Sequence, residues 1–442
     1  MTDFLAFPPA RGISGTVRVP SSKSATNRAL VLAALSATPV AVRRPLVSDD
    51  TRTLVACLAA MGASVETDVG DDEEAPEEIS LRGPLGAAAD RTTTLDARDS
   101  GTAARFLTAL AAAVPGDFRI RGSARLSERP MSPLIEALRS LGADVREEGA
   151  AGCLPLRLRG GSLSGGSVRV EASQSSQFLS ALLLLGAAGV PIEVASEGAI
   201  ASAPYVAMTV ESLRAFGHRV ESDGDGDGGV GGPWRVARGV SAPAFYETPG
   251  DYSSAVPLLA SVGICGGEVA LEGLHWPSAD ADAHALPVLH RMGIRIDAGA
   301  LRVVARAERG ALSPVTVRAA DFPDAVPALA ALAAFVPGRS RFEDVGHLRW
   351  KESDRLAALE RLLAAGGTRA FSEGLALVIE GQRPGAVAPT AGAALPTFRD
   401  HRIAMAAALL ALGRPGMRIE DPGCVSKSYP AFFRDLDRLC VR

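Results

Sequence analysis

The sequence has 442 residues, of which 47% are apolar and only 5% aromatic, and its formal net charge is −4. A charge so close to zero excludes a general attraction to nucleic acid or to an anionic membrane, so any basic site must be local. The five cysteines form no C-x-x-C pair, and their odd number argues against a disulfide framework. Since no apolar run could cross a bilayer and no signal peptide is evident, we expect a soluble, cytoplasmic protein.

A five-residue pattern recurs six times and defines the repeats of the chain. The pattern is leucine, two variable residues, an apolar residue and glycine, and it recurs about every 75 residues. Its copies begin at Leu58, Leu138, Leu213, Leu289, Leu362 and Leu436, and the last copy ends on Cys440 instead of glycine. Self-similarity at a fixed period is the signature of a repeat architecture, so we expect six copies of one structural unit.

In chain order, each unit contains an apolar helix followed by a proline or a glycine. These helices are predicted over residues 28–35, 102–114, 178–185, 254–262, 325–336 and 403–412. The residues expected to stop them are Pro39, Pro115, Gly186, Gly263, Pro337 and Gly413. Because the helices are apolar on all sides, we expect them to be buried on every side.

Short alternating runs after the apolar helices, such as 118–121, 192–194 and 417–420, predict strands. A second, amphipathic helix then ends at the signature glycine, and one more strand follows, as at 64–66 and 294–296. Each unit is therefore predicted to be β-α-β-α-β-β. Six such units contain twelve helices, and two lobes of three units, with the apolar helices inside and the sheets outside, are a compact way to bury them.

Two segments interrupt the repeats, an acidic run at 71–78 and an Asp/Gly tract at 223–232. The D-x-D-x-D spacing of the tract resembles a calcium loop, but such a loop needs a glutamate where Trp234 stands. We therefore interpret the tract as a surface turn.

The predicted helix starts carry the residues of a candidate anion site. Ser and Asp at these starts, including Ser127 and Ser426 at the expected starts of two second helices, are ordinary N-caps. Cations at the same places oppose the helix dipole, unless an anion binds among them. Those cations are Lys23, Arg28, Arg129, Lys351, Arg355, Arg402 and Lys427. Salt bridges to Asp49, Glu128 or Asp354 would explain one or two of them, and the nearby carboxylates of Asp324 and Glu352 are candidates for proton transfer.

Familiar cofactor and nucleophile motifs do not occur in the sequence. It contains no Walker loop, no H-E-x-x-H and no G-x-S-x-G, and its six histidines lack ligand spacing. We therefore expect chemistry that needs neither a metal nor a nucleotide held on a phosphate loop.

The chain resembles the 5-enolpyruvylshikimate-3-phosphate (EPSP) synthase family over almost its full length. Eight segments match in the same order: Ser22-Lys23-Ser24 with Asn27-Arg28, Ser100-Gly101-Thr102 with Arg105, Glu128-Arg129-Pro130, Ser175-Ser176-Gln177-Phe178, Pro323-Asp324-Ala325, the run from Arg349 to Leu356, the run from Asp400 to Met405, and Lys427-Ser428-Tyr429-Pro430.

The resemblance implies a fold of the α/β class, a two-lobed inside-out α/β barrel with three repeats in each lobe. Residues 21–247 would form the N-terminal lobe, and residues 1–20 with 248–442 the C-terminal lobe. The implied reaction, part of aromatic amino acid biosynthesis, transfers the enolpyruvyl group of phosphoenolpyruvate to the 5-hydroxyl of shikimate 3-phosphate. This reaction passes through a tetrahedral intermediate in the cleft between the lobes and needs no cofactor. The resemblance further implies a monomer whose lobes close on the ligands.

The resemblance also implies the roles of individual residues. Shikimate 3-phosphate would be bound by Lys23, Ser24, Arg28, Ser175, Ser176, Gln177, Ser202, Tyr205, Asp324, His347 and Lys351. Phosphoenolpyruvate would be bound by Lys23, Gly101, Arg125, Gln177, Arg355, His401, Arg402 and Lys427. Asp324 would accept the proton of the 5-hydroxyl and Glu352 would protonate the methylene carbon, with Lys23 assisting. Glycine at position 101 implies that glyphosate competes with phosphoenolpyruvate.

Three residues depart from the family pattern. Asp99 and His347 stand where asparagine is common, and Asp280 stands where glutamine is usual. We expect Asp99 either to cap a helix or to weaken phosphoenolpyruvate binding, and we expect His347 still to donate a hydrogen bond.

The sequence fits three alternative functions on this scaffold less well. The sister transferase acting on UDP-N-acetylglucosamine usually carries a Lys-Asn pair and a loop cysteine, whereas this chain has Lys23-Ser24 and no cysteine over 116–133. A non-catalytic anion-binding protein would be expected to lose Asp324 or Glu352, and both are present. An RNA 3′-terminal phosphate cyclase would need a nucleotide site that the sequence does not show.

Overall fold

The computed structural model describes residues 3–6, 10–68, 77–87, 91–223, 232–239, 241–383, 385 and 392–442. Most of the acidic run at 71–78 and of the Asp/Gly tract at 223–232 lies outside these residues. The chain forms two compact units, residues 21–248 and residues 1–20 with 249–442. The lobe boundary inferred from the resemblance differs from this division by one residue.

The unit of residues 21–248 holds three repeats. Its helices are α1 (Lys23–Leu35), α2 (Asp49–Ala60), α3 (Gly101–Ala113), α4 (Ala124–Ser127), α5 (Ser132–Ser140), α6 (Gln177–Ala187) and α7 (Pro204–Ala215). Its strands are β3 (Val40–Arg43), β4 (Ser64–Asp68), β5 (Glu78–Arg82), β6 (Thr92–Asp96), β7 (Gly116–Arg121), β8 (Asp144–Glu147), β9 (Leu156–Gly160), β10 (Gly166–Val170), β11 (Ile192–Ser196), β12 (Arg219–Ser222), β13 (Trp234–Ala237) and β14 (Phe245–Glu247).

The second unit holds the other three repeats. Its helices are α8 (Tyr252–Cys265), η1 (Ala281–His284), α9 (Ala285–Arg291), α10 (Val326–Ala333), η2 (Gly346–Trp350), α11 (Arg355–Ala365), α12 (His401–Gly413), η3 (Pro422–Lys427) and α13 (Phe432–Leu439). Its strands are β1 (Phe4–Ala6), β2 (Gly12–Arg18), β15 (Gly267–Glu272), β16 (Arg295–Ala298), β17 (Arg302–Ala307), β18 (Thr316–Arg318), β19 (Gly338–Glu343), β20 (Arg369–Glu373), β21 (Ala376–Gly381), β22 (Ala394–Leu395), β23 (Arg418–Glu420) and β24 (Cys440–Val441).

One strand order recurs among the sheets. In the second repeat, β6 runs parallel to β7, and β9 lies antiparallel between β7 and β8. The same order appears as β10-β11-β13-β12 and β18-β19-β21-β20. The parallel first pair is joined through a buried helix and the last pair is antiparallel, as the predicted β-α-β-α-β-β unit requires.

In two sheets, the first strand comes from a part of the chain that is distant in sequence. In the first repeat, β14 at the end of the unit pairs in parallel with β3. In the fourth repeat, β2 near the N-terminus pairs in parallel with β15, which starts after residue 266. The chain therefore passes between the units twice, once after β2 and once after β14.

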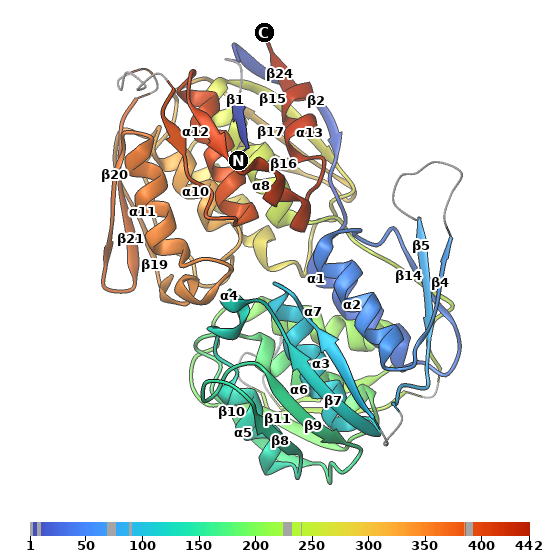
Figure 1. Ribbon diagram of the computed structural model, residues 1–442. Helices are drawn as coiled ribbons and strands as arrows, with labels where there is room; N and C mark the ends of the chain where they lie inside the picture. The colour runs from blue at the N-terminus through green and yellow to red at the C-terminus, as the bar shows by residue number, and fades with distance from the viewer. Residues whose placement is uncertain are drawn as a thin grey trace. The chain divides into compact units, whose positions relative to one another are not determined.

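The apolar helices form the core of each unit. Residues of α1, α3 and α6 are buried in one unit and residues of α8, α10 and α12 in the other. Within each trio the helices pack against one another, while the sheets lie outside, as β20 and β21 do at the edge of their unit in Figure 1. This arrangement confirms the prediction of helices that are buried on all sides.

Glycine permits the close approach of sheet and helix at equivalent points in two repeats. A Cβ at Gly160, the last residue of β9, would lie 2.0 Å from the carbonyl oxygen of Ala111. A Cβ at Gly381, the last residue of β21, would lie 2.0 Å from the carbonyl oxygen of Ala333. The two helix ends therefore rest directly on strand backbone.

Several helix boundaries were predicted wrongly. Gly186 and Gly263 lie inside α6 and α8 instead of stopping them, because burial of these apolar helices outweighs the roughly 1 kcal/mol that an interior glycine costs. In the second repeat, Ser127 ends α4, and α5 begins only at Ser132. In the sixth, the segment from Ser426 to Pro430 lies before α13, which begins at Phe432.

The signature glycines follow the second helices as predicted in four repeats. Gly62, Gly142, Gly217 and Gly293 all have positive φ, which an L-residue adopts only under strain. In the fifth repeat Gly366 has a φ of −74°, and Gly367, at +78°, takes the left-handed position. That prediction was therefore off by one residue.

Two observations bear on ligands and membranes. No helix in the described ranges has both the length and the apolar character needed to cross a bilayer. Within the same ranges, no three His, Cys, Asp or Glu side chains gather where they could hold a metal ion. All five cysteines are free thiols.

Candidate active site

One buried guanidinium joins three carboxylates in the unit that contains α10, α11 and α12. Arg355 is the first residue of α11 and its side chain is 0% exposed. Its Nη1 donates to Asp324 Oδ1 at 2.7 Å, its Nη2 to Glu352 Oε2 at 2.9 Å, and its Nε to Asp400 Oδ2 at 2.8 Å. The two predicted proton-transfer carboxylates are thus held on the same cation.

Further cations surround these two carboxylates. Lys351 Nζ lies 3.3 Å from Asp324 Oδ1, and Arg402 Nε lies 3.8 Å from Asp324 Oδ2. Lys427 Nζ, at the end of η3, lies 3.8 Å from Glu352 Oε1. Burial by itself would raise the pKa of Asp324, but the charges of Lys351, Arg355 and Arg402 outweigh it and hold that pKa well below its usual range.

Arg402 is oriented by the start of a neighbouring helix. Its Nη2 donates to Ser253 Oγ at 2.7 Å and lies 3.4 Å from Asp251 Oδ2. Asp251 is the N-cap of α8, where it accepts the Ser254 N–H. His401 precedes Arg402, is fully buried, and has its Nδ1 3.8 Å from Asp400 Oδ1. The structure thus brings His401, Arg402, Arg355 and Asp324 together at the starts of α10, α11 and α12.

His347 lies in η2 close to Lys351. Burial, with the charge of Lys351, lowers the pKa of His347 from 6.5 to about 3, so the imidazole is neutral. A backbone hydrogen bond with Asp344 leaves Nε2 buried, with no hydrogen-bond partner among the described residues. A buried polar atom of this kind is expected to find its partner in a ligand or a water.

In the other unit, Arg28 of α1 contacts two other predicted shikimate 3-phosphate residues. Its side chain donates to the carbonyl oxygens of Ser24, at 2.9 Å, and Tyr205, at 3.0 Å, and to Thr209 Oγ1, at 2.7 Å. Arg28 is only 2% exposed. Its position is therefore fixed by α7 before any ligand arrives.

Lys23 opens α1 beside a carboxylate of α2. Its Nζ lies 3.2 Å from Asp50 Oδ2, and both side chains are nearly buried. Ser22 and Ser48 cap the two helices. The predicted assisting lysine is therefore ion-paired within its own unit.

The start of α3 is crowded by two arginines. A Cβ on Gly101 would lie 2.5 Å from Arg129 Nη1 and 2.7 Å from Arg105 Nη1. Arg105 Nη1 also donates to Gln177 Oε1 at 3.1 Å, and Gln177 Nε2 donates to Thr102 Oγ1 at 3.0 Å. The predicted residues Gly101 and Gln177 are thus linked through Arg105, which is not among the predicted site residues.

The remaining predicted residues of this unit lie at the starts of α6 and α7 and in α4. Ser175 Oγ accepts the Gln177 N–H at 3.3 Å, and Ser176 is buried at the N-cap of α6. Ser202, with φ of +59°, accepts the Tyr205 N–H on its carbonyl oxygen. Arg125 is partly exposed and pairs with Glu128 at 2.9 Å.

The sequence profile of EPSP synthase (3-phosphoshikimate 1-carboxyvinyltransferase) matches residues 8–436. The chain belongs to the EPSP synthase family. It is 40% identical to a 3-phosphoshikimate 1-carboxyvinyltransferase from Thermococcus kodakarensis and 39% identical to one from Syntrophobacter fumaroxidans, with 98% of each chain covered in both cases. The solved structure of an EPSP synthase from Acinetobacter baumannii is similar, with a TM-score of 0.77 and 25% identity over 100% of this chain and 99% of that one.

These comparisons confirm three predictions. The resemblance to the EPSP synthase family is confirmed by the profile and the relatives. The α/β fold of repeated units is confirmed by the structural similarity. The chain is an enzyme of the transferase class, as the relatives' shared description indicates, and the non-catalytic alternative loses its support.

Ion pairing in this EPSP synthase family member is more extensive than expected. Of the seven cations at helix starts, at least five pair with carboxylates of the described residues: Lys23, Lys351, Arg355, Arg402 and Lys427. Their partners are Asp50, the two candidate catalytic carboxylates and the N-cap residues Asp251 and Asp400, because helix starts within each unit meet one another. Pairing therefore explains most of these cations.

Asp99 is not the side-chain cap of α3. Ser100 fills that role by accepting the Ala103 N–H, while the Asp99 carboxylate accepts a hydrogen bond from Ser123 Oγ. Ser123 in turn caps α4. The carboxylate therefore joins the starts of α3 and α4, next to Gly101.

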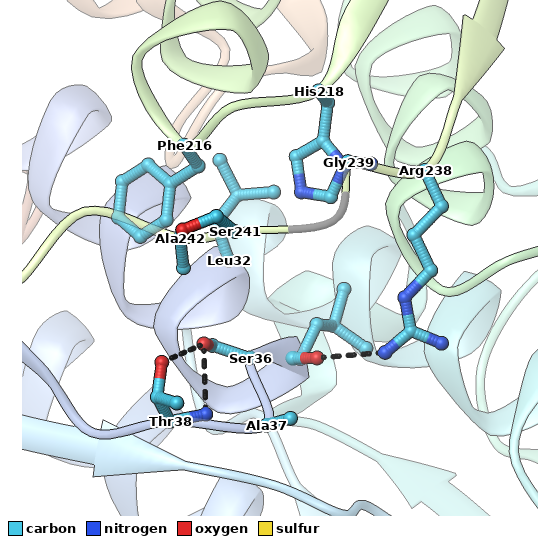
Figure 2. A pocket seen from close by; sticks show the side chains of 11 residues that line it. Leu32, Ser36, Ala37, Thr38, Phe216, His218, Arg238, Gly239, Ser241 and Ala242 are labelled. Atoms are coloured by element: carbon cyan, nitrogen blue, oxygen red, sulfur yellow. Dashed lines mark hydrogen bonds between the residues drawn. The ribbon is translucent and has the colours of Figure 1, made fainter.

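A separate cavity of about 320 Å³ lies at the C-terminal end of α1 (Figure 2). Leu32 and Phe216 line it, together with His218 and Arg238. Arg238 Nη2 donates to the carbonyl oxygen of Leu35, and His218 Nδ1 accepts the Gly239 N–H. None of the predicted site residues lines this cavity, and Arg238 is bound to the end of α1.

Proposed function

We propose that this enzyme transfers the enolpyruvyl group of phosphoenolpyruvate to the 5-hydroxyl of shikimate 3-phosphate and releases phosphate. The observation that carries the proposal is the arrangement of Asp324 and Glu352 on Arg355, at 2.7 and 2.9 Å, with Lys351, Arg402 and Lys427 around them. Family membership supports the choice of substrates.

The acceptor is bound chiefly through its anionic groups. Ser24 and Arg28 bind the shikimate carboxylate, with Tyr205 and Gln177 along the ring. Ser175, Ser176 and Ser202 bind the 3-phosphate together with Lys351 and His347. Because Arg28 is already fixed by Thr209 and Tyr205, binding the carboxylate there costs little side-chain entropy.

Phosphoenolpyruvate is bound by cations at helix starts. Arg355, His401, Arg402 and Lys427 contribute from one unit, and Lys23, Arg125, Gln177 and the backbone at Gly101 from the other. Glyphosate would compete with phosphoenolpyruvate for these groups. A side chain at position 101 would displace Arg105 and Arg129 from the start of α3.

The reaction requires four proton transfers. The 5-oxygen bonds to C2 of phosphoenolpyruvate while Asp324 takes the hydroxyl proton and Glu352 protonates C3, which gives a tetrahedral intermediate with a methyl group. The Glu352 carboxylate then takes a proton back from that methyl group, which re-forms the double bond as the C2–O bond to phosphate breaks. The departing phosphate takes the proton that Asp324 had accepted, so both side chains return to their starting states. Lys23 assists by stabilising the negative charge that develops on the departing phosphate.

The ligands themselves make Asp324 a better base. A pKa held well below its usual range by three cations makes the carboxylate a weak proton acceptor. The two substrates bring about five to six negative charges, counting about two per phosphate. When the 3-phosphate engages Lys351 and phosphoenolpyruvate engages Arg355 and Arg402, the carboxylate loses part of that stabilisation and its pKa rises.

The direct test is an acceptor comparison. Purified enzyme is supplied with phosphoenolpyruvate and either shikimate 3-phosphate or UDP-N-acetylglucosamine, and phosphate release is measured. We expect release only with shikimate 3-phosphate. Release with UDP-N-acetylglucosamine alone would assign the sister transferase activity, and release with neither would overturn the proposal.

A further inference from the structure

The start of α10 differs from the starts of the two other central helices in its unit. Asp251 caps α8 and Asp400 caps α12, each by accepting a backbone N–H of its own helix. The corresponding aspartate, Asp324, precedes α10, whose N-cap residue is Ala325 and has no side-chain cap. The Asp324 carboxylate instead faces Lys351, Arg355 and Arg402.

A residue from another part of the chain accepts a hydrogen bond from the backbone at the start of α10. Asp282 lies in η1, is 0% exposed, and accepts the Ala325 N–H on Oδ1 at 2.8 Å. The same N–H lies 3.2 Å from the carbonyl oxygen of Phe322, which closes a tight turn. Because Ala325 follows Asp324 directly, this contact fixes the peptide that carries the Asp324 side chain.

Asp282 is itself held in place by its own turn. Asp280 Oδ1 accepts the Asp282 N–H at 3.0 Å, and Ser278 Oγ accepts the Asp280 N–H at 3.1 Å. A buried carboxylate that accepts a backbone N–H makes a stronger hydrogen bond than a neutral acceptor. A chain of hydrogen bonds therefore runs from Ser278 through Asp280 and Asp282 to the residue after Asp324.

We propose that Asp282 is a positioning residue for Asp324: it caps the start of α10 from η1 and so leaves the Asp324 carboxylate available for proton transfer. The inference rests on the proposed function, in which Asp324 is the base. Removing the acceptor lets the turn at Pro323 to Ala325 relax, and a displacement of about 1 Å at a reacting group costs on the order of 100-fold in rate.

Three variants separate positioning from folding. Asp282→Ala and Asp282→Leu both remove the acceptor, the first leaving a cavity and the second filling the space. Asp282→Asn keeps a carbonyl oxygen that accepts the Ala325 N–H. The matched control is Ser340→Ala, because Ser340 is also buried, lies in β19, and its Oγ accepts the Val315 N–H at 3.3 Å.

The test is to measure kcat and KM for phosphate release by each variant, with the melting temperature as a check on folding. Asp282→Ala and Asp282→Leu should lose on the order of 100-fold in kcat, with KM for both substrates within about threefold, while Asp282→Asn keeps most of kcat. Ser340→Ala should lower the melting temperature and leave kcat unchanged.

Each other outcome contradicts the inference in a recognisable way. Unchanged kcat in Asp282→Ala and Asp282→Leu, or an Asp282→Asn variant as impaired as these two, would overturn the positioning role. Failure of both acceptor-free variants to fold would assign Asp282 to folding alone. An inactive wild-type enzyme would instead remove the proposed function, and the inference with it.

Discussion

His347 shows how burial at the candidate site alters a single residue. Its pKa falls from 6.5 to about 3, whereas an unfolded chain returns it to an ordinary value. Between those values the unfolded chain binds one more proton than the folded chain. The free energy of unfolding therefore decreases as the pH falls from about 6.5 toward 3.

We predict that His347→Asn weakens this pH dependence. Its free energy of unfolding should decrease less steeply than that of the wild type over this range, by up to about 1.4 kcal/mol per pH unit. Urea unfolding followed at several pH values between 4 and 7 measures the slope. His290→Asn, at an exposed position, is the control, and equal slopes for wild type and His347→Asn would contradict the prediction.

At the scale of elements, Gly381 allows the end of β21 to pack closely against the end of α10. A Cβ there would lie 2.0 Å from the Ala333 carbonyl oxygen and 2.3 Å from that of Val336, and both are backbone atoms that cannot move aside cheaply. The strand end and the end of α10 would have to separate.

We predict that Gly381→Ala lowers the free energy of unfolding by about 1–3 kcal/mol, the usual cost of overpacking. Gly12→Ala is the matched control, because it also lies at a strand end of this unit and its Cβ would meet nothing closer than 3.6 Å. Denaturant unfolding measures both variants. Equal free energies of unfolding for wild type and Gly381→Ala would contradict the prediction, because they would show that the strand moves away from α10 without a loss of stability.

The central helices could be predicted from sequence, whereas several helix starts could not. An all-apolar run between polar caps marks α3 and α12 to within a few residues. Ser127 and Ser426 look like helix starts, but both lie in short turns before the true helix, because local capping signals do not distinguish one turn of helix from a longer one.

Site residues could be predicted where they lie in a contiguous motif. Lys351, Glu352 and Arg355 are within one run of sequence, and the resemblance supplied their roles. Asp282 contacts Ala325 over 43 residues, and Arg105 contacts Gln177 over 72. Such contacts depend on which helix starts lie next to one another in the folded unit, and a local sequence pattern does not predict this.

At the scale of the whole molecule, two strand pairings tie distant parts of the chain together. The repeat predicted six units, but it did not predict that β14 completes the first sheet and β2 the fourth. Parallel strands can pair only when the chain between them crosses over, and that connection can be of any length above a dozen residues. The period of the sequence repeat therefore does not predict which distant strand completes the first and fourth sheets.

The central claim is that the paired carboxylates transfer protons during enolpyruvyl transfer. Glu352→Gln keeps the size of the side chain and removes the proton donor, so phosphate release should fall by about 100- to 10,000-fold at saturating substrates. Glu268→Gln is the control, because Glu268 pairs with Arg306 at an exposed position of the same unit.

The deciding measurement is the single-turnover rate of phosphate release by wild-type enzyme, Glu352→Gln and Glu268→Gln, with phosphoenolpyruvate and shikimate 3-phosphate bound. The account predicts that wild type and Glu268→Gln release phosphate at similar rates, and that Glu352→Gln binds both ligands but is slower by at least about 100-fold. Release by Glu352→Gln at the wild-type rate, with both ligands bound, would contradict it.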